Sequence, residues 1–205
     1  SAIEAYQTMP EASPLNEVAE LQAALNLEEI DRGDEAVTIL KKAIAENSKS
    51  IDPLMALGNL YRARKDFKNA SDVYDKAIAL IDQPQPGHWN LYYSSGIALE
   101  RLKRWSEAEA RFKKALELSP DQPFVLNYLG YSWVDQNINL DEAFKMLQKA
   151  VDQRPNDGFI VDSLGWAYYR RGEYELAAKY LEKAVELRPA DSTINDHLGD
   201  CLLYT

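Results

Sequence analysis

The sequence is poor in the residues that carry metal and covalent chemistry. Of 205 residues, one is cysteine, Cys201, and two are histidines, His88 and His197. A single cysteine excludes an intrachain disulfide and does not assign the redox compartment. His197 and Cys201 are four residues apart, which suits two zinc ligands on one helix, but no second His–Cys pair completes such a site. We therefore expect no metal site, and we interpret Cys201 as a small buried residue.

Long apolar runs and runs of β-branched residues are also missing. No stretch approaches the ~18 apolar residues of a membrane-spanning helix, so we expect no direct membrane insertion. Ala, Leu, Glu and Lys dominate, which favours helices and offers no strands for a sheet. We find no glycine-rich phosphate loop, nucleophile elbow or Ser-His-Asp arrangement. The sequence thus predicts an all-α protein that is not an enzyme and that uses no cofactor.

Basic residues are fewer than acidic residues in this sequence. Lys and Arg number 23 against 33 Asp and Glu, which gives a formal net charge of -10. Binding to a nucleic-acid backbone needs clustered Lys and Arg, and so does binding to an anionic membrane surface. We therefore expect protein partners and no nucleic acid.

The clearest pattern in the chain runs from Gly158 to Asp191 and predicts two amphipathic helices joined by a short turn. Large and small apolar residues recur three or four positions apart in both halves, which places them on one helical face. Small residues let the two helices approach closely, because a larger side chain would overpack the contact by roughly 1–3 kcal/mol. This stripe consists of Val161, Leu164, Gly165, Tyr168, Ala177, Leu181 and Ala184.

The same pattern recurs along the chain. The predicted repeats are residues 17–50, 51–84, 89–122, 123–157 and 158–191. Residues 1–16 match the second helix of a truncated repeat, and residues 192–205 match the first helix of another. We therefore predict a single array over 1–205, with the proline-containing segment 82–88 as a longer loop inside it. Because both ends are cut through repeats, we expect the sequence to be a piece of a longer protein.

A period of about 34 residues with this pattern resembles the tetratricopeptide repeat (TPR) family. The resemblance implies a right-handed α-solenoid of helix-turn-helix repeats, whose first helices line a concave groove. More narrowly, Tyr128–Ser132, Asp162–Tyr169 and Asp196–Asp200 look like C-terminal repeats of large exported proteobacterial TPR proteins. Some of those are outer-membrane lipoprotein adaptors of a carboxyl-terminal processing protease. This narrower resemblance implies a bacterial protein in the periplasm or at the outer membrane.

Five positions of each first helix lie off the packing stripe and form a second face, which the resemblance places in the groove. Aromatic side chains supply contact area there, while Asn, Asp and Arg hydrogen-bond an extended backbone. The alternative is that the aromatic residues only pack against adjacent first helices. Met55 stands where family members that capture a chaperone's C-terminal carboxylate have their first Lys, so we do not expect that ligand. The predicted peptide-binding residues are Tyr93, Asn127, Tyr131, Asp162, Trp166, Tyr169, Arg170, Asp196 and Asp200.

Two functions of different classes follow from these features. The first is a non-enzymatic scaffold or adaptor that binds a polypeptide segment of a partner protein in its concave groove. The second is a self-association or regulatory arm of a larger protein whose enzymatic or membrane-anchoring part lies outside this sequence. We expect Leu198, Leu202 and Leu203 to lack their natural cover, so that they could drive artificial contacts.

Overall fold

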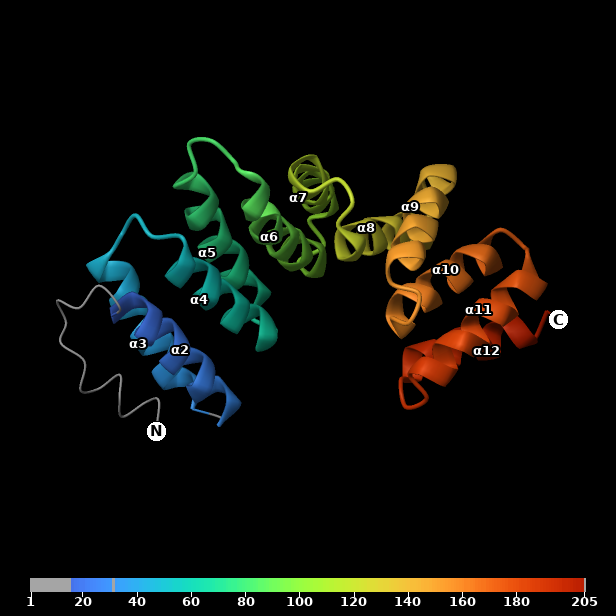
Figure 1. Cartoon of the computed structure of the whole chain (residues 1–205), viewed down its shortest axis with the longest axis horizontal. Helices are drawn as coiled ribbons and strands as arrows, with labels where there is room; N and C mark the ends of the chain where they lie inside the picture. Colours follow the sequence, from blue (N-terminus) through green and yellow to red (C-terminus); the bar gives the residue numbers. More distant parts are fainter. Residues whose placement is uncertain (1–15, 31, 205) are drawn as a thin grey trace. The chain divides into compact units, whose positions relative to one another are not determined.

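A computed structural model describes residues 16–30 and 32–204 (Figure 1). Its described residues form helices and no strands, which confirms the predicted all-α class. The predicted helix in residues 1–16 lies almost wholly outside the described residues. The helices are α2 (Asn16–Glu29), α3 (Gly33–Glu46), α4 (Asp52–Ala63), α5 (Phe67–Ala79), the 3₁₀ turn η1 (Pro86–His88), α6 (Trp89–Arg101), α7 (Trp105–Leu118), α8 (Pro123–Asp135), α9 (Leu140–Gln153), α10 (Gly158–Arg170), α11 (Tyr174–Leu187) and α12 (Ser192–Leu202).

Each of the five predicted intervals holds one pair of helices, with a short turn between them. In the turns that follow α4, α6, α8 and α10 a residue has positive φ: 61° at Lys65, 63° at Lys103, 59° at Asn137 and 77° at Gly172. A residue in the left-handed conformation after a helix ends the helix, and the backbone N–H groups at this point donate hydrogen bonds to carbonyl oxygens of its last turn. The recurrence of this backbone conformation explains why the second helix folds back on the first in these four pairs.

The repeated glycine sets how closely two paired helices approach. A Cβ built on Gly165 of α10 would lie 2.8 Å from Cγ of Leu181 on α11, and 3.2 Å from the backbone nitrogen of Leu181. A Cβ on Gly96 would lie 2.5 Å from the ring of Phe112. Only a residue without a side chain fits such contacts. The packing stripe predicted from the sequence is therefore the contact between the paired helices.

The contacts of the chain fall into two compact units, one ending at Leu118 and the other beginning at Ser119. Unit 1 contains α2 to α7, and unit 2 contains α8 to α12. The division follows α7, whereas segment 82–88 lies inside unit 1. The expectation of a single array over 1–205 stays a prediction.

The core of each unit consists of the residues that face the neighbouring helices. In unit 1 one cluster runs from Ala24 through Leu57 and Tyr74 to Ala98. In unit 2, Ala177 and Leu181 pack with Cys201, which is 0% exposed, and this confirms the interpretation of Cys201 as a buried residue.

Candidate functional site

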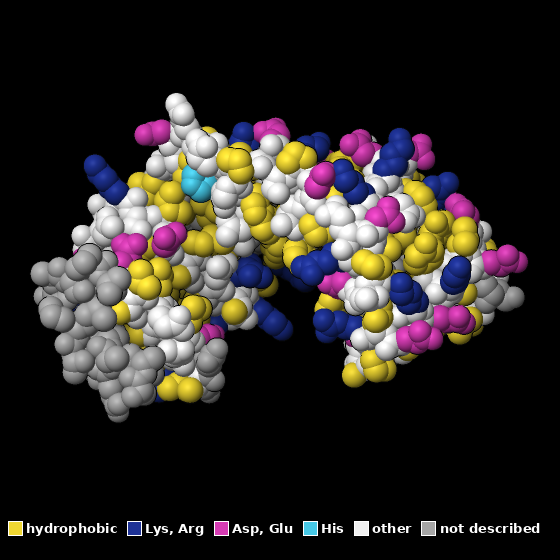
Figure 2. Space-filling view, viewed as in Figure 1, with side chains coloured by type: hydrophobic (Ala, Val, Ile, Leu, Met, Phe, Trp, Pro, Cys, Tyr) yellow, Lys and Arg dark blue, Asp and Glu magenta, His cyan; other side chains and the backbone are white. Residues whose placement is uncertain are grey.

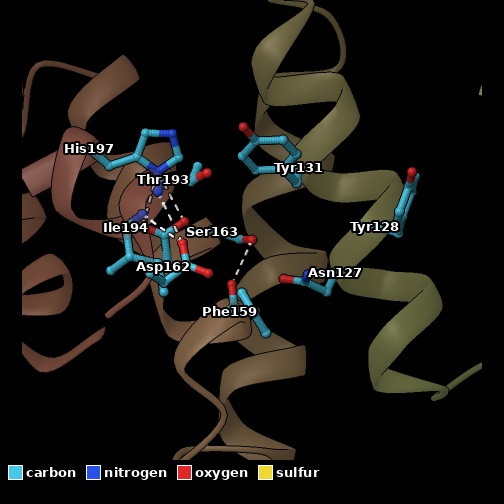
Figure 3. A pocket seen from close by; sticks show the side chains of 10 residues that line it. Asn127, Tyr128, Tyr131, Phe159, Asp162, Ser163, Thr193, Ile194 and His197 are labelled. Carbon is cyan, nitrogen blue, oxygen red and sulfur yellow. Dashed lines mark hydrogen bonds and ion pairs between the residues drawn. The ribbon is translucent and has the colours of Figure 1, made fainter. Parts of the chain in front are cut away.

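Three first helices of unit 2, α8, α10 and α12, enclose a hollow of about 260 Å³ (Figure 3). In Figure 3, Tyr131 of α8 and His197 of α12 lie across from each other, and Asp162 of α10 lies next to His197. We call this space the unit 2 hollow. It is lined by Asn127, Tyr128, Tyr131, Phe159, Asp162, Ser163, Asp191, Thr193, Ile194 and His197.

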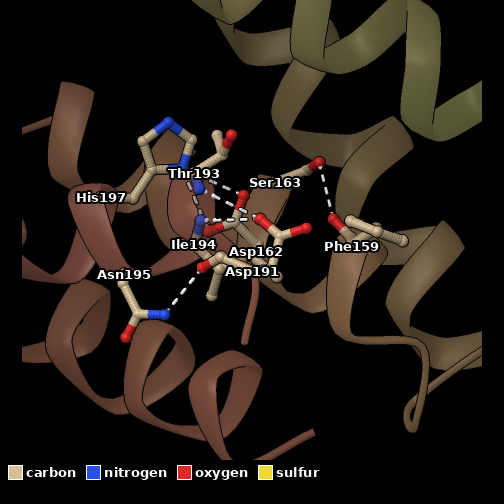
Figure 4. Close-up of polar contacts among 8 residues, drawn as sticks. All are labelled: Phe159, Asp162, Ser163, Asp191, Thr193, Ile194, Asn195 and His197. Carbon is tan, nitrogen blue, oxygen red and sulfur yellow. Dashed lines mark hydrogen bonds and ion pairs between the residues drawn. The ribbon is translucent and has the colours of Figure 1, made fainter. Parts of the chain in front are cut away.

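Two aspartates set where the helices of the hollow begin. Asp157 precedes α10 and accepts a hydrogen bond from the backbone N–H of Phe159. Asp191 precedes α12 and accepts from the backbone N–H groups of Thr193 and Ile194 (Figure 4). Such N-caps satisfy donors that a helix leaves free at its start. Because the first turns are fixed in this way, Asp162 and His197 reach the hollow from defined positions.

Asp162 and His197 form a buried pair across α10 and α12. The Nδ1 atom of His197 lies 3.0 Å from both carboxylate oxygens of Asp162. The two residues are 5% and 9% exposed. A carboxylate without a proton only accepts hydrogen bonds, so this contact places a proton on Nδ1 of His197.

Aromatic rings surround the imidazole of His197. The Trp166 ring stacks on it with centroids 4.2 Å apart and planes at 17°, and Tyr131 lies 6.4 Å away. Tyr169 stacks on Trp166 at 4.8 Å. Burial raises the pKa of Tyr131, and the nearby carboxylates of Asp135 and Asp162 raise it further. The Tyr131 hydroxyl therefore stays protonated at neutral pH and available as a donor.

Two buried polar atoms of unit 2 have no hydrogen-bond partner among the described residues. They are Oδ1 of Asn127, an acceptor, and Nε1 of Trp166, a donor. Asn127 lines the hollow and extends from α8 toward α10, as Figure 3 shows. Buried polar groups in folded proteins are nearly always paired, so two exceptions beside one hollow need a reason.

The structure brings five of the nine predicted residues together. Asn127, Tyr131 and Asp162 line the hollow, and Trp166 and Tyr169 belong to the ring stack on His197.

The other four predicted residues lie outside this cluster. Arg170 donates a hydrogen bond of 3.3 Å to the backbone oxygen of Asp135. Asp196 and Asp200 are exposed on α12 and do not line the hollow. Tyr93 belongs to unit 1, where it packs against Trp89 and Phe112, and burial raises its pKa to about 12.

His197 is the site residue that the sequence reasoning missed. Its spacing from Cys201 suggests only a metal ligand, whereas its partner is Asp162, 35 residues earlier. That separation is one repeat plus one residue, which is the register of a contact between neighbouring first helices. A search for acid–base pairs at this separation would have found it.

The described residues offer little for other kinds of site. They contain no group of three or more His, Cys, Asp or Glu residues arranged to hold a metal ion. None of the described helices combines the length and the apolar character needed to cross a membrane.

Comparison with known proteins identifies the repeats. Three models described as tetratricopeptide repeat match residues 49–121, 93–158 and 162–191. The TPR repeat-containing protein PA4667 of Pseudomonas aeruginosa is 30% identical over 145 residues, which cover 69% of this chain and 24% of that protein. RNA polymerase-associated protein CTR9 of Caenorhabditis elegans is 27% identical over 157 residues, and the match covers 13% of its length. The chain thus spans a quarter or less of these two relatives.

Solved structures with the same fold are TPR solenoids. YrrB, described as a TPR protein with an unusual peptide-binding site, has a TM-score of 0.70 and 22% identity over 97% of this chain and 99% of its own. A chain of the APC/C hetero-tetramer Cut9–Hcn1 has a TM-score of 0.82 and 16% identity over 99% of this chain and 39% of its own. These likenesses confirm the predicted solenoid of helical hairpins. The repeats, their pairing and these matches together show that the chain belongs to the tetratricopeptide repeat family.

Proposed function

We propose that this protein is a non-enzymatic scaffold whose unit 2 hollow binds a polypeptide segment of a partner protein. The TPR fold is consistent with a scaffold for protein–protein interaction. The observation that carries the finer proposal is the unpaired Oδ1 of Asn127 in the wall of the hollow. An extended peptide offers a backbone N–H at every residue except proline, which is the donor that this oxygen lacks.

The energetics favour this assignment. A buried polar atom without a partner destabilises the free protein by about 1–3 kcal/mol. A ligand that satisfies the atom recovers this free energy on binding. This proposal requires the Asn127 amide to rotate on binding, so that the buried Oδ1 meets a peptide N–H. The unpaired Nε1 of Trp166 adds a donor for a peptide carbonyl in the same region.

The aromatic lining supports the same function. Tyr128, Tyr131 and Phe159 present large rigid surfaces that contact a peptide with little loss of side-chain freedom. YrrB, which shares the fold, is described as having an unusual peptide-binding site. The expectations of an exported adaptor, of a periplasmic location and of self-association stay predictions. Leu202 and Leu203, which the sequence predicts to lack cover, are 53% and 81% exposed.

The test starts from a random-peptide library displayed on phage and selected on the full chain. Peptides that the selection recovers are synthesised and titrated against the wild-type protein and Tyr131→Ala. Because Tyr131 forms one wall of the hollow, we expect its truncation to weaken binding by about 2 kcal/mol, roughly 30-fold in Kd.

Tyr180→Ala is the matched control. Tyr180 stacks on Tyr168 and packs beside Val161, outside the lining of the hollow. We expect this variant to melt at a lower temperature and to bind the peptides with unchanged Kd while it is folded. If no peptide is enriched, or if Tyr131→Ala binds as tightly as wild type, the hollow is not the binding site.

A further inference from the structure

The wall of the hollow contains two acidic side chains and one histidine, His197. Asp162 and Asp191 contribute carboxylates, and none of the lining residues is Lys or Arg. On the face of unit 2 visible in Figure 2, by contrast, side chains of both signs are interspersed. The lining therefore differs from that mixed surface and favours a positively charged ligand group.

Asp162 retains capacity for a ligand. Both of its oxygens contact one atom, Nδ1 of His197, and a carboxylate offers about four acceptor positions. At a pH where an imidazole is neutral, it does not offset the charge of a carboxylate beside it. A buried carboxylate whose charge has no cationic partner attracts a cation more strongly than an exposed one does, since solvent screens it less.

Asp191 holds a different place in the same wall. Its Oδ1 already accepts two backbone N–H groups at the start of α12. These bonds engage one oxygen and leave the charge of the carboxylate near the hollow. Asp191 thus adds to the negative potential, while Asp162 supplies the carboxylate that a ligand would contact.

Two arginines lie beside the hollow, since Arg188 covers the lining residue Phe159 and the charge of Arg170 acts on Tyr131. The guanidinium of Arg188 lies over the Phe159 ring at 4.2 Å, and Arg170 donates to the backbone oxygen of Asp135. Neither lines the hollow. Asp196 and Asp200 are exposed on α12 and increase the negative charge of this helix.

The shape of the hollow selects a long side chain. Asp162 is only 5% exposed, so a short polar group on a peptide does not reach it. Lys and Arg carry their charge at the end of an apolar stem. That stem can pass between aromatic side chains such as Tyr131 and Phe159, and the charge then meets the carboxylate. Guanidinium groups already lie over Phe124 and Phe159 in this unit, at 4.7 and 4.2 Å.

We propose that the hollow receives a basic side chain, lysine or arginine, of the bound peptide, with Asp162 as its counter-ion. This inference rests on the proposed peptide-binding function and names the kind of partner. The partner segment is basic at the residue that enters the hollow, and aromatic walls hold the stem of that residue.

The experiment uses fluorescein-labelled peptide pools with random uncharged residues around one fixed central residue. The central residue is Lys, acetyl-lysine, Arg, citrulline or Glu, because acetyl-lysine and citrulline keep the length of the side chain and remove its charge. Kd is measured by fluorescence anisotropy with the full chain, at about pH 8, where an imidazole is mostly neutral. We expect the Lys and Arg pools to bind wild type about tenfold or more tightly than their neutral counterparts.

Two variants with the same change of net charge locate the effect. Asp162→Asn keeps an oxygen that accepts from His197 Nδ1, and it should reduce the preference for charge to less than about twofold. Asp196→Asn, on the exposed part of α12, should keep the full preference. If Asp162→Asn does not fold, the comparison of charged with neutral pools on wild type and Asp196→Asn decides instead.

The outcomes separate this inference from the proposed function. If all pools bind wild type equally and Tyr131→Ala binds them more weakly, the peptide site is supported and the inference of a basic side chain is wrong. The basic side chain is also wrong if the Glu pool binds most tightly, or if folded Asp162→Asn keeps the preference for charge. If no pool binds, both the site and its preference are wrong.

Discussion

At the residue scale, Asn127 allows binding and stability to be separated. Its Oδ1 is buried without a partner, so it destabilises the free protein. Leucine has nearly the same shape and no polar atom. We expect Asn127→Leu to leave the free energy of unfolding unchanged or to raise it by up to about 1 kcal/mol. The same variant should bind the selected peptides about tenfold or more weakly, as measured by urea unfolding and by calorimetric titration.

Asn195→Leu provides the reverse pattern as a control. The Nδ2 of Asn195 donates to the backbone oxygens of Pro189 and Asp191, so its hydrogen bonds are already made within the protein. Replacing it should lower the free energy of unfolding by about 1 kcal/mol and leave Kd unchanged. A variant Asn127→Leu that loses stability but not affinity would show that Asn127 has a structural role.

The sequence predicts individual site residues less well than it predicts the fold. Asn127, Tyr131 and Asp162 can be identified because the repeat places them off the packing stripe. Asp196 occupies the equivalent position in α12 and yet is exposed, whereas its neighbour His197 enters the hollow. Alignment of the repeats locates the groove-facing positions of a helix with an error of about one residue. Contacts between side chains of neighbouring helices decide which of the adjacent residues points inward.

At the element scale, the position of the repeated glycine makes a sharp prediction. Gly165 and Gly199 hold the same place in successive repeats. A Cβ on Gly165 would lie 2.8 Å from Leu181 Cγ, whereas a Cβ on Gly199 would meet nothing within 4 Å. We expect Gly165→Ala to lower the free energy of unfolding by about 1–3 kcal/mol, because the contact between α10 and α11 would be overpacked.

Gly199→Ala should do the opposite. Alanine is favoured over glycine inside a helix by about 0.5–1 kcal/mol, so this variant should be equally or more stable. Denaturant unfolding followed by circular dichroism measures both. Equal destabilisation by the two changes would mean that helix packing does not set the glycine requirement.

The pairing of the helices can be predicted from the sequence because its signals are local. The small-large stripe of Gly165, Ala177 and Leu181 repeats with the period of the hairpin, and each turn lies where the stripe is interrupted. The division after Leu118 has no such signal. The segment with two prolines, 82–88, is the weakest connection by composition, yet η1 lies there and contacts α6 and α7. A boundary that depends on how elements pack together leaves no mark in local composition.

At the scale of the whole molecule, the hollow and its aromatic stack lie entirely in unit 2. All lining residues fall between Asn127 and His197, and the ring stack adds only Trp166 and Tyr169. In a repeat protein, stability is the sum of terms within and between neighbouring repeats. A fragment of residues 119–205 therefore keeps the hairpins and the contacts that build the hollow.

We expect this fragment to be helical and to bind the selected peptides with a Kd within about threefold of the full chain. Calorimetric titration of the fragment, of residues 1–118 and of the full chain measures this. Residues 1–118 should not bind these peptides, because Asp162, Asn127 and Tyr131 are absent from that part. Tyr93 of unit 1 is also among the predicted groove residues, so it tests whether unit 1 contributes to binding. We expect Tyr93→Ala in the full chain to leave Kd unchanged. If the fragment is helical but does not bind, residues of unit 1 are needed for peptide binding. Loss of binding in Tyr93→Ala would identify Tyr93 as one of them.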